Sequence, residues 1–178
     1  MIDTGVRQGT SVYGSLIQGF CTHGDLVKGK ELVTEMMNKG IPPPDIKFFH
    51  SIMQNLCTEG RVIEARDILD LIAQIGMRPD VCTFNLLIGG YFLVRKIEHT
   101  SKIFDDMVSY GLKPCNITYG ILINGYCKNG RIDHGLILFK DMLRKGLKPT
   151  TFNYSPSPLA SPPWNSLNSK IFYILYLY

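Results

Sequence analysis

Histidine and cysteine are the residues of this 178-residue chain that would most readily mark a catalytic or metal site. They are His23, His50, His99 and His134, with Cys21, Cys57, Cys82, Cys115 and Cys127. No histidine has a cysteine or serine partner at the spacing of a known catalytic motif. No cysteine pair and no histidine–cysteine pair has the spacing of zinc ligands. We therefore expect no enzyme, no metal and no cofactor.

Hydrogen bonding by recurrent polar side chains is the second kind of chemistry that the sequence offers. Four rows of mostly small or polar residues have helical spacing: Gly14, Gln18, Thr22; His50, Gln54, Thr58; Asn85, Gly89, Leu93; and Gly120, Asn124, Lys128. Each row is predicted to lie opposite an apolar stripe. One such row is ordinarily a solvated helix face. Four rows in register predict one extended binding surface.

Residues 116–150 show which elements must carry such a row. The first stripe is Tyr119, Leu122, Ile123, Tyr126 and Cys127, and the second is Ile132, Leu136, Phe139, Met142 and Leu143. This periodicity predicts two amphipathic helices. Gly130 and Gly146 are placed as left-handed caps that end them. Two helices of this length cannot bury both stripes alone, so they need neighbouring hairpins.

The same unit recurs along most of the chain. Glycines that close helices are separated by 35, 36, 35 and 35 residues at Gly5, Gly40, Gly76, Gly111 and Gly146; prolines follow at Pro44, Pro79, Pro114 and Pro149. An aromatic residue opens each first helix at Tyr13, Phe49, Phe84 and Tyr119. The units are 10–45, 46–80, 81–115 and 116–150. The sequence predicts an all-α fold, a right-handed α-solenoid of antiparallel helix pairs.

Both ends depart from this period. Residues 1–9 match the end of a unit, so we expect the chain to begin inside a preceding repeat, as a fragment would. Residues 151–178 read as an aborted repeat and an irregular tail, because four prolines stand where a first helix should run. The final KIFYILYLY is too short to span a bilayer as a helix. The sequence shows no targeting leader.

Composition is consistent with a solenoid. Hydrophobic residues make up 45% and charged residues 19% of the chain, as in folded proteins. The net charge of +4 permits a polyanionic partner without requiring one. Cys21, Cys57 and Cys127 share one apolar slot, so we expect small core residues. Their placement and the odd cysteine count argue against a disulfide framework.

These units resemble pentatricopeptide repeats, in particular the regular 35-residue P-class of plant organelle RNA-binding proteins. Three segments are similar to typical sequences of that family: TFNLLIGGY, ITYGILINGYCKNGRID and LFKDMLRKGLKP. The resemblance covers about residues 1–154. Within the family, these segments most resemble the fertility-restorer-like branch. Tetratricopeptide repeats are the competing family, but their period is 34 and their tryptophan signature is absent.

The resemblance implies that each repeat reads one base of single-stranded RNA. It implies a pair formed by the residue after the opening aromatic and the last residue of the repeat: Gly14 with Asp45, His50 with Asp80, Asn85 with Cys115, and Gly120 with Thr150. Asn85 at this position tends to go with pyrimidines, while the other pairs leave the base unreadable. A branched aliphatic just before this site sandwiches the base, a role that Ile117 fits and Ser11, Lys47 and Cys82 do not. Lys128 is placed to approach a phosphate.

The leading interpretation is an RNA-binding adaptor in organelle RNA processing, stability or translation. Its partner would be an organelle transcript, with other RNA-processing proteins besides, and neither a membrane nor a small-molecule substrate is expected. Family members usually work in mitochondria or plastids. A protein-binding helical scaffold and a truncated product without retained function are the alternatives. The H-x-E and P-C-x-x-C strings of the deaminase found in some relatives do not occur here.

Overall fold

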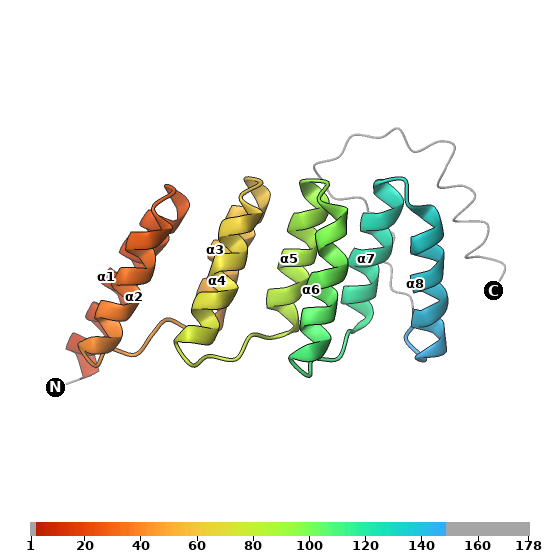
Figure 1. Ribbon diagram of the computed structural model, residues 1–178. Coiled ribbons are helices and arrows are strands. Elements are labelled where there is room, and N and C mark those ends of the chain that lie inside the picture. The colour runs from red at the N-terminus through yellow and green to blue at the C-terminus, as the bar shows by residue number, and fades with distance from the viewer. Residues whose placement is uncertain (1–2, 149–178) are drawn as a thin grey trace.

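The computed structural model describes the backbone of residues 3–148 and the side chains of residues 10–148. Within that part of the chain every regular element is an α-helix, as predicted. The helices are α1 (Asp3–Thr22), α2 (Leu26–Asn38), α3 (Ile46–Thr58), α4 (Val62–Gln74), α5 (Val81–Leu93), α6 (Ile97–Ser109), α7 (Asn116–Lys128) and α8 (Ile132–Arg144). Consecutive helices pair into four hairpins that stand side by side in chain order (Figure 1).

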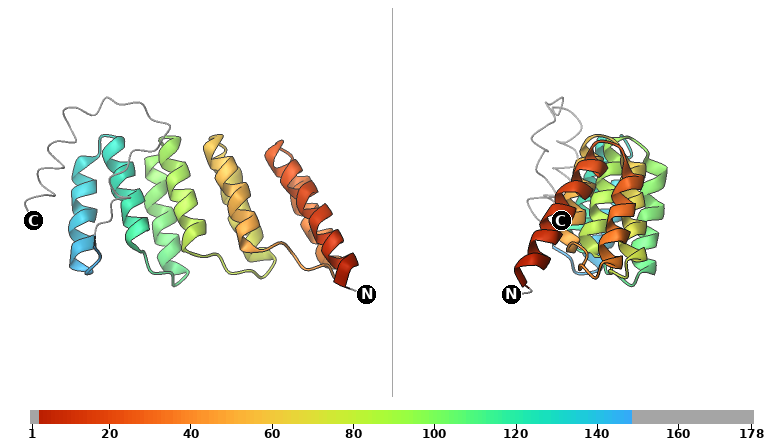
Figure 2. Two further views of the ribbon diagram at one scale, coloured as in Figure 1. Left: turned by 180° about the vertical axis from the view of Figure 1, so that it is seen from behind. Right: turned by 90° about the vertical axis from the view of Figure 1, so that its left-hand side faces the viewer.

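The hairpins form an all-α solenoid. The first helices α1, α3, α5 and α7 pack on one another in succession. Viewed along the row, the hairpins lie behind one another (Figure 2). This arrangement aligns equivalent positions of the first helices from one end of the array to the other.

Helix starts and ends follow the expected local chemistry. Asp25, Asp45 and Asp80 precede α2, α3 and α5, and each carboxylate accepts a backbone N–H in the first turn, over 2.9–3.1 Å. Gly130 and Gly146 have φ of 77° and 70°, which confirms the predicted left-handed caps.

The helix end predicted at Gly5 is wrong. Helix α1 runs through this position from Asp3 to Thr22. The other closing glycines have a proline three or four residues later, whereas the first proline after Gly5 is Pro42, beyond the end of α1. Without that proline nothing prevents the helix from continuing. The assignment of residues 1–9 to a preceding repeat stays a prediction, and the predictions on Thr150 and residues 151–178 lie outside the described residues.

The core runs along the array between the hairpins. Ile52, Leu87 and Leu122, at one register of successive first helices, are 0%, 0% and 2% exposed. Burying a side chain of this size contributes about 1.5–3 kcal/mol. Cys21 and Cys57 are buried and Cys127 is half-buried, all with free thiols. No helix of the described chain is long and apolar enough to cross a membrane.

Candidate nucleic-acid interface

The residues that follow the first two opening aromatics face the next hairpin, where Gly14 lies against Phe48 and His50 contacts Thr83. Gly14 is half-buried, the His50 side chain is 15% exposed and Asn85 is 8% exposed. Gly120 is buried. At Asn85 and Gly120 this row is therefore buried and is not a solvated helix face. For Asn85 the reason is that α7 packs against α5.

The second member of each predicted pair begins the next first helix. Asp45, Asp80 and Cys115 are the N-cap residues of α3, α5 and α7. Thr150, the fourth member, lies outside the described residues. A pair therefore joins the first helix of one repeat to the helix start of the following repeat, across the junction between hairpins.

The second repeat brings its pair into direct contact. His50 Nε2 lies 3.1 Å from Asp80 Oδ1 and 3.0 Å from Thr83 Oγ1. Thr83 donates its backbone N–H and its hydroxyl to Asp80 Oδ1, each over 2.9 Å. The Thr83 hydroxyl in turn accepts the Asp80 backbone N–H at 3.3 Å. This capping box positions the carboxylate beside the imidazole.

The hydrogen bonds at Asp80 favour its ionised form. Partial burial acts to raise the pKa of this carboxyl group. The two hydrogen bonds from Thr83 and the nearby His50 ring outweigh burial, so the pKa lies below its usual value. Asp80 is therefore a carboxylate at neutral pH and acts as an acceptor only.

The third repeat holds an unpartnered acceptor. Asn85 Oδ1 is buried and has no hydrogen-bond partner among the described residues. Leaving such an atom unpaired ordinarily costs about 1–3 kcal/mol. Cys115, its predicted mate, has its Sγ atom 3.6 Å from Thr118 Oγ1. The described chain shows no hydrogen bond between Asn85 and Cys115, so an external donor is needed to satisfy the amide oxygen.

The Cys115 thiol also has a perturbed acidity. Partial burial acts to raise its pKa, but hydrogen bonds at the start of α7, from Thr118 first, outweigh burial and place the pKa below the ordinary value. The lowered pKa makes the thiolate easier to form, and a thiolate is a hydrogen-bond acceptor. Cys115 stands where the two preceding junctions carry an aspartate.

The first repeat offers little polar chemistry at its pair. A Cβ atom built on Gly14 would lie 3.7 Å from the Phe48 ring, so this ring covers the position. Asp45 is exposed, and its carboxylate accepts the Phe48 backbone N–H at 2.9 Å. In the described part of the chain, Gly14 and Asp45 are not joined by a hydrogen bond.

Ile117 and Lys128 lie at opposite ends of α7. Ile117 is 50% exposed in its first turn, where an aliphatic side chain can contact a base. Lys128, the last residue of the helix, is exposed. Along the same faces Gln18 and Gln54 are exposed, Asn124 is half-buried and Leu93 is 67% exposed. These positions would extend the surface beyond the junction pairs.

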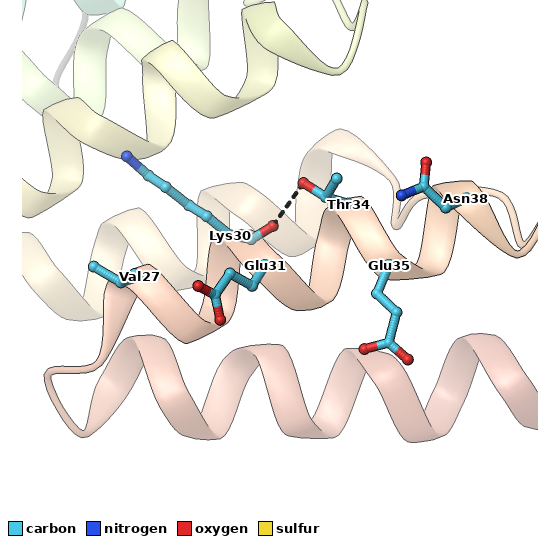
Figure 3. A pocket seen from close by; sticks show the side chains of 6 residues that line it. All are labelled: Val27, Lys30, Glu31, Thr34, Glu35 and Asn38. Atoms are coloured by element: carbon cyan, nitrogen blue, oxygen red, sulfur yellow. Dashed lines mark hydrogen bonds between the residues drawn. The ribbon is translucent and has the colours of Figure 1, made fainter.

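A surface pocket of about 540 Å³ lies elsewhere. Its lining residues all come from α2, as Figure 3 shows: Val27, Lys30, Glu31, Thr34, Glu35 and Asn38. None of them belongs to the first-helix rows. In the described part of the chain no group of histidine, cysteine and acidic side chains is placed to hold a metal ion.

Sequence reasoning missed the threonines that complete these junctions. Thr83 is fully buried between His50 and Asp80, and Thr118 takes the same place beside Cys115. A signal was present: each threonine stands three residues after the N-cap, the spacing of a capping box. The missing information was which helix of the preceding repeat would face it.

The stacked hairpins, and the residue pairs at the junctions between them, define a helical-repeat protein with a row of positions for hydrogen bonding. Three sequence profiles match the chain: a PPR repeat family profile at residues 79–128 and 114–155, a PPR repeat profile at 11–41 and a pentatricopeptide repeat domain profile at 31–92. These matches cover most of the chain between residues 11 and 155. The chain belongs to the pentatricopeptide repeat family.

Similar proteins include plant members of that family. A pentatricopeptide repeat-containing protein of Arabidopsis thaliana is 32% identical over 100 residues, covering 56% of this chain and 20% of the relative. The crystal structure of the maize pentatricopeptide repeat protein PPR10 is 25% identical, with a TM-score of 0.63, and the match covers 82% of this chain and 21% of PPR10. PPR10 in complex with an 18-nt psaJ RNA element matches with a TM-score of 0.62, 25% identity and coverage of 81% and 21%. The chain thus spans about a fifth of the length of these relatives.

Proposed function

We propose that this chain is a single-stranded RNA-binding adaptor in which each repeat meets one base. The contact between His50 and Asp80 carries this proposal, because it joins both members of a predicted reading pair at one junction. The unpartnered Asn85 oxygen supports it, since a base N–H would satisfy this atom. The similar protein PPR10 has been solved with an RNA element.

The proposed role is binding, without catalysis by this chain, in organelle RNA processing, stability or translation. Mitochondria are the proposed compartment, with plastids as the alternative. Immunoblots of purified mitochondria and plastids with an antibody against residues 10–148 would distinguish them. Recovery in neither organelle would contradict this part of the proposal.

The affinity of four repeats is expected to be modest. Stacking and edge contacts contribute about 1–3 kcal/mol per base before ordering costs. Fluorescence anisotropy with labelled single-stranded RNA should show binding that weakens as salt increases. A partner protein that binds with little salt dependence and is not displaced by RNA would instead support the helical scaffold.

Asn85→Ala tests the pairing. The substitution removes a buried oxygen that has no partner, so it should not weaken the fold. It should weaken binding to a pyrimidine-containing RNA about fivefold, the equivalent of one hydrogen bond. Asn129→Ala is the matched control, because the Asn129 side chain bonds Gly125 O within α7 and lies outside the junction row. Equal effects of both variants would contradict the pairing.

A further inference from the structure

The position of the ring proton on His50 follows from its neighbours. Thr83 donates its only hydroxyl proton to Asp80 Oδ1, and the ionised carboxylate has no proton to give. His50 Nε2 lies within 3.1 Å of both oxygens, so Nε2 must be the donor in both contacts. In the neutral ring the other nitrogen, Nδ1, is therefore an acceptor.

Two acceptor atoms remain at this junction. His50 Nδ1 and Asp80 Oδ2 have no hydrogen-bond partner among the residues that the structure describes. The two side chains keep 15% and 47% of their surfaces exposed, so both reach solvent. The second repeat thus presents acceptors and no side-chain donor to an incoming base.

A base edge must match this pattern. Uracil places its N–H between two carbonyl acceptors, and adenine and cytosine each place one amino group beside an acceptor nitrogen. Guanine alone carries two adjacent donors, N1–H and the N2 amino group, on its Watson–Crick edge. A carboxylate or imidazole acceptor facing a base acceptor would leave both desolvated and unpaired, which is costly.

We infer that the second repeat selects guanine, through the Asp80 carboxylate and a His50 ring held with its proton on Nε2. This inference rests on the proposed RNA binding. The other junctions lack the arrangement, because Gly14 has no side chain and Asn85 offers both a donor and an acceptor.

Single-base discrimination tests the inference. The probes are short labelled uridine oligonucleotides that carry one central uridine, cytidine, adenosine or guanosine, titrated against the full chain in slightly alkaline buffer. A uridine host suits the pyrimidine preference expected for Asn85, and it lets the chain choose its register. The guanosine oligonucleotide should bind on the order of tenfold more tightly than the other three.

Two variants assign that preference to the second repeat. Asp80→Asn keeps a side chain that caps α5 but replaces the carboxylate with an amide, and His50→Phe keeps a ring without nitrogens. Each should bind the four oligonucleotides within about twofold of one another. His134→Phe is the control, because the His134 ring stacks on Tyr126 in the fourth hairpin, and it should keep the guanine preference. Circular dichroism checks that each variant folds; if His50→Phe does not, Asp80→Asn decides.

The outcomes separate this inference from the proposed function. Salt-dependent binding of all four oligonucleotides with equal affinity, or with another base preferred, would overturn guanine selection and leave RNA binding standing. A guanine preference that survives both variants would also overturn it. Absence of binding to every oligonucleotide would overturn the proposed function and guanine selection together.

Discussion

The junction between the first two hairpins differs from the two later junctions. Helices α3 and α5, and likewise α5 and α7, pack more extensively than α1 and α3. Thr83 and Thr118 stand three residues after the N-cap in the later junctions, and Phe48 stands there in the first. The small threonine lets His50 reach Asp80, whereas the phenylalanine ring fills the space beside Gly14.

A second position in the first helices also affects how closely neighbouring hairpins approach each other. Gly90 and Gly125 face the preceding hairpin, where a Cβ atom would clash with Cys57 and with the Phe92 ring. Asn55 occupies this register at the first junction. Because an asparagine side chain is larger than a hydrogen atom, we infer that it keeps α1 and α3 from the close approach seen at the later junctions. Residue size at two positions would then set both the packing and whether a polar pair can form.

Leu87→Ala should have the largest effect on stability. Leu87 is 0% exposed and fills a later junction, so truncation should cost about 2–5 kcal/mol in the free energy of unfolding. Leu16 has the same register in the first hairpin but is 46% exposed, and Leu16→Ala should cost less than about 1 kcal/mol. Urea denaturation followed by circular dichroism measures both. Similar losses would show that the outer face of the first hairpin is as well packed as a junction.

Gly90→Asn would introduce at a later junction the residue type that occupies this position at the first junction. The new side chain would meet the Cys57 sulfur and Val62, so α3 and α5 must separate, at a cost of about 1–3 kcal/mol. Gly19→Asn is the matched control, since a Cβ there has no neighbour within 4 Å. Thermal unfolding of the two variants gives the comparison. An unchanged Tm for Gly90→Asn would mean that close approach is not required.

Arg61→Ala should loosen the first junction further. The Arg61 guanidinium donates to the carbonyl oxygens of Cys21 and Thr22 at 3.0 and 2.8 Å, and it also pairs with Glu64. These bonds join the end of α1 to the second hairpin, so their loss should destabilise the first hairpin by about 1–2 kcal/mol. Hydrogen exchange of the α1 and α2 amides would show this as faster exchange.

Arg131→Ala provides the control for that measurement. Arg131 has the same register in the fourth hairpin, and its guanidinium makes no hydrogen bond or ion pair with the described residues. Its removal should change stability by less than about 0.5 kcal/mol. Uniform exchange changes across all hairpins in the Arg61 variant would contradict a role at the first junction.

The hairpin architecture could be predicted because its determinants are local. Each second helix ends at a glycine with positive φ, and a proline follows that glycine. Between these helix ends, the apolar residues recur with the spacing of an α-helix. The exception at Gly5 obeys the same logic, since the proline is missing there. The junction chemistry could not be predicted in this way. Whether His50 reaches Asp80 depends on how closely α5 approaches α3, which is a property of packing between repeats.

Arg95 has a backbone conformation that is unusual for a residue with a side chain. It replaces the glycine that otherwise joins the two helices of a hairpin, and it has φ of 58°. Gly24, Gly60 and Gly130 take positive φ at the same register without a Cβ penalty. We therefore expect Arg95→Gly to stabilise the third hairpin by about 1 kcal/mol. A rise in the urea midpoint with an unchanged slope would show it, whereas a fall would mean that the exposed Arg95 side chain contributes more than its backbone strain costs.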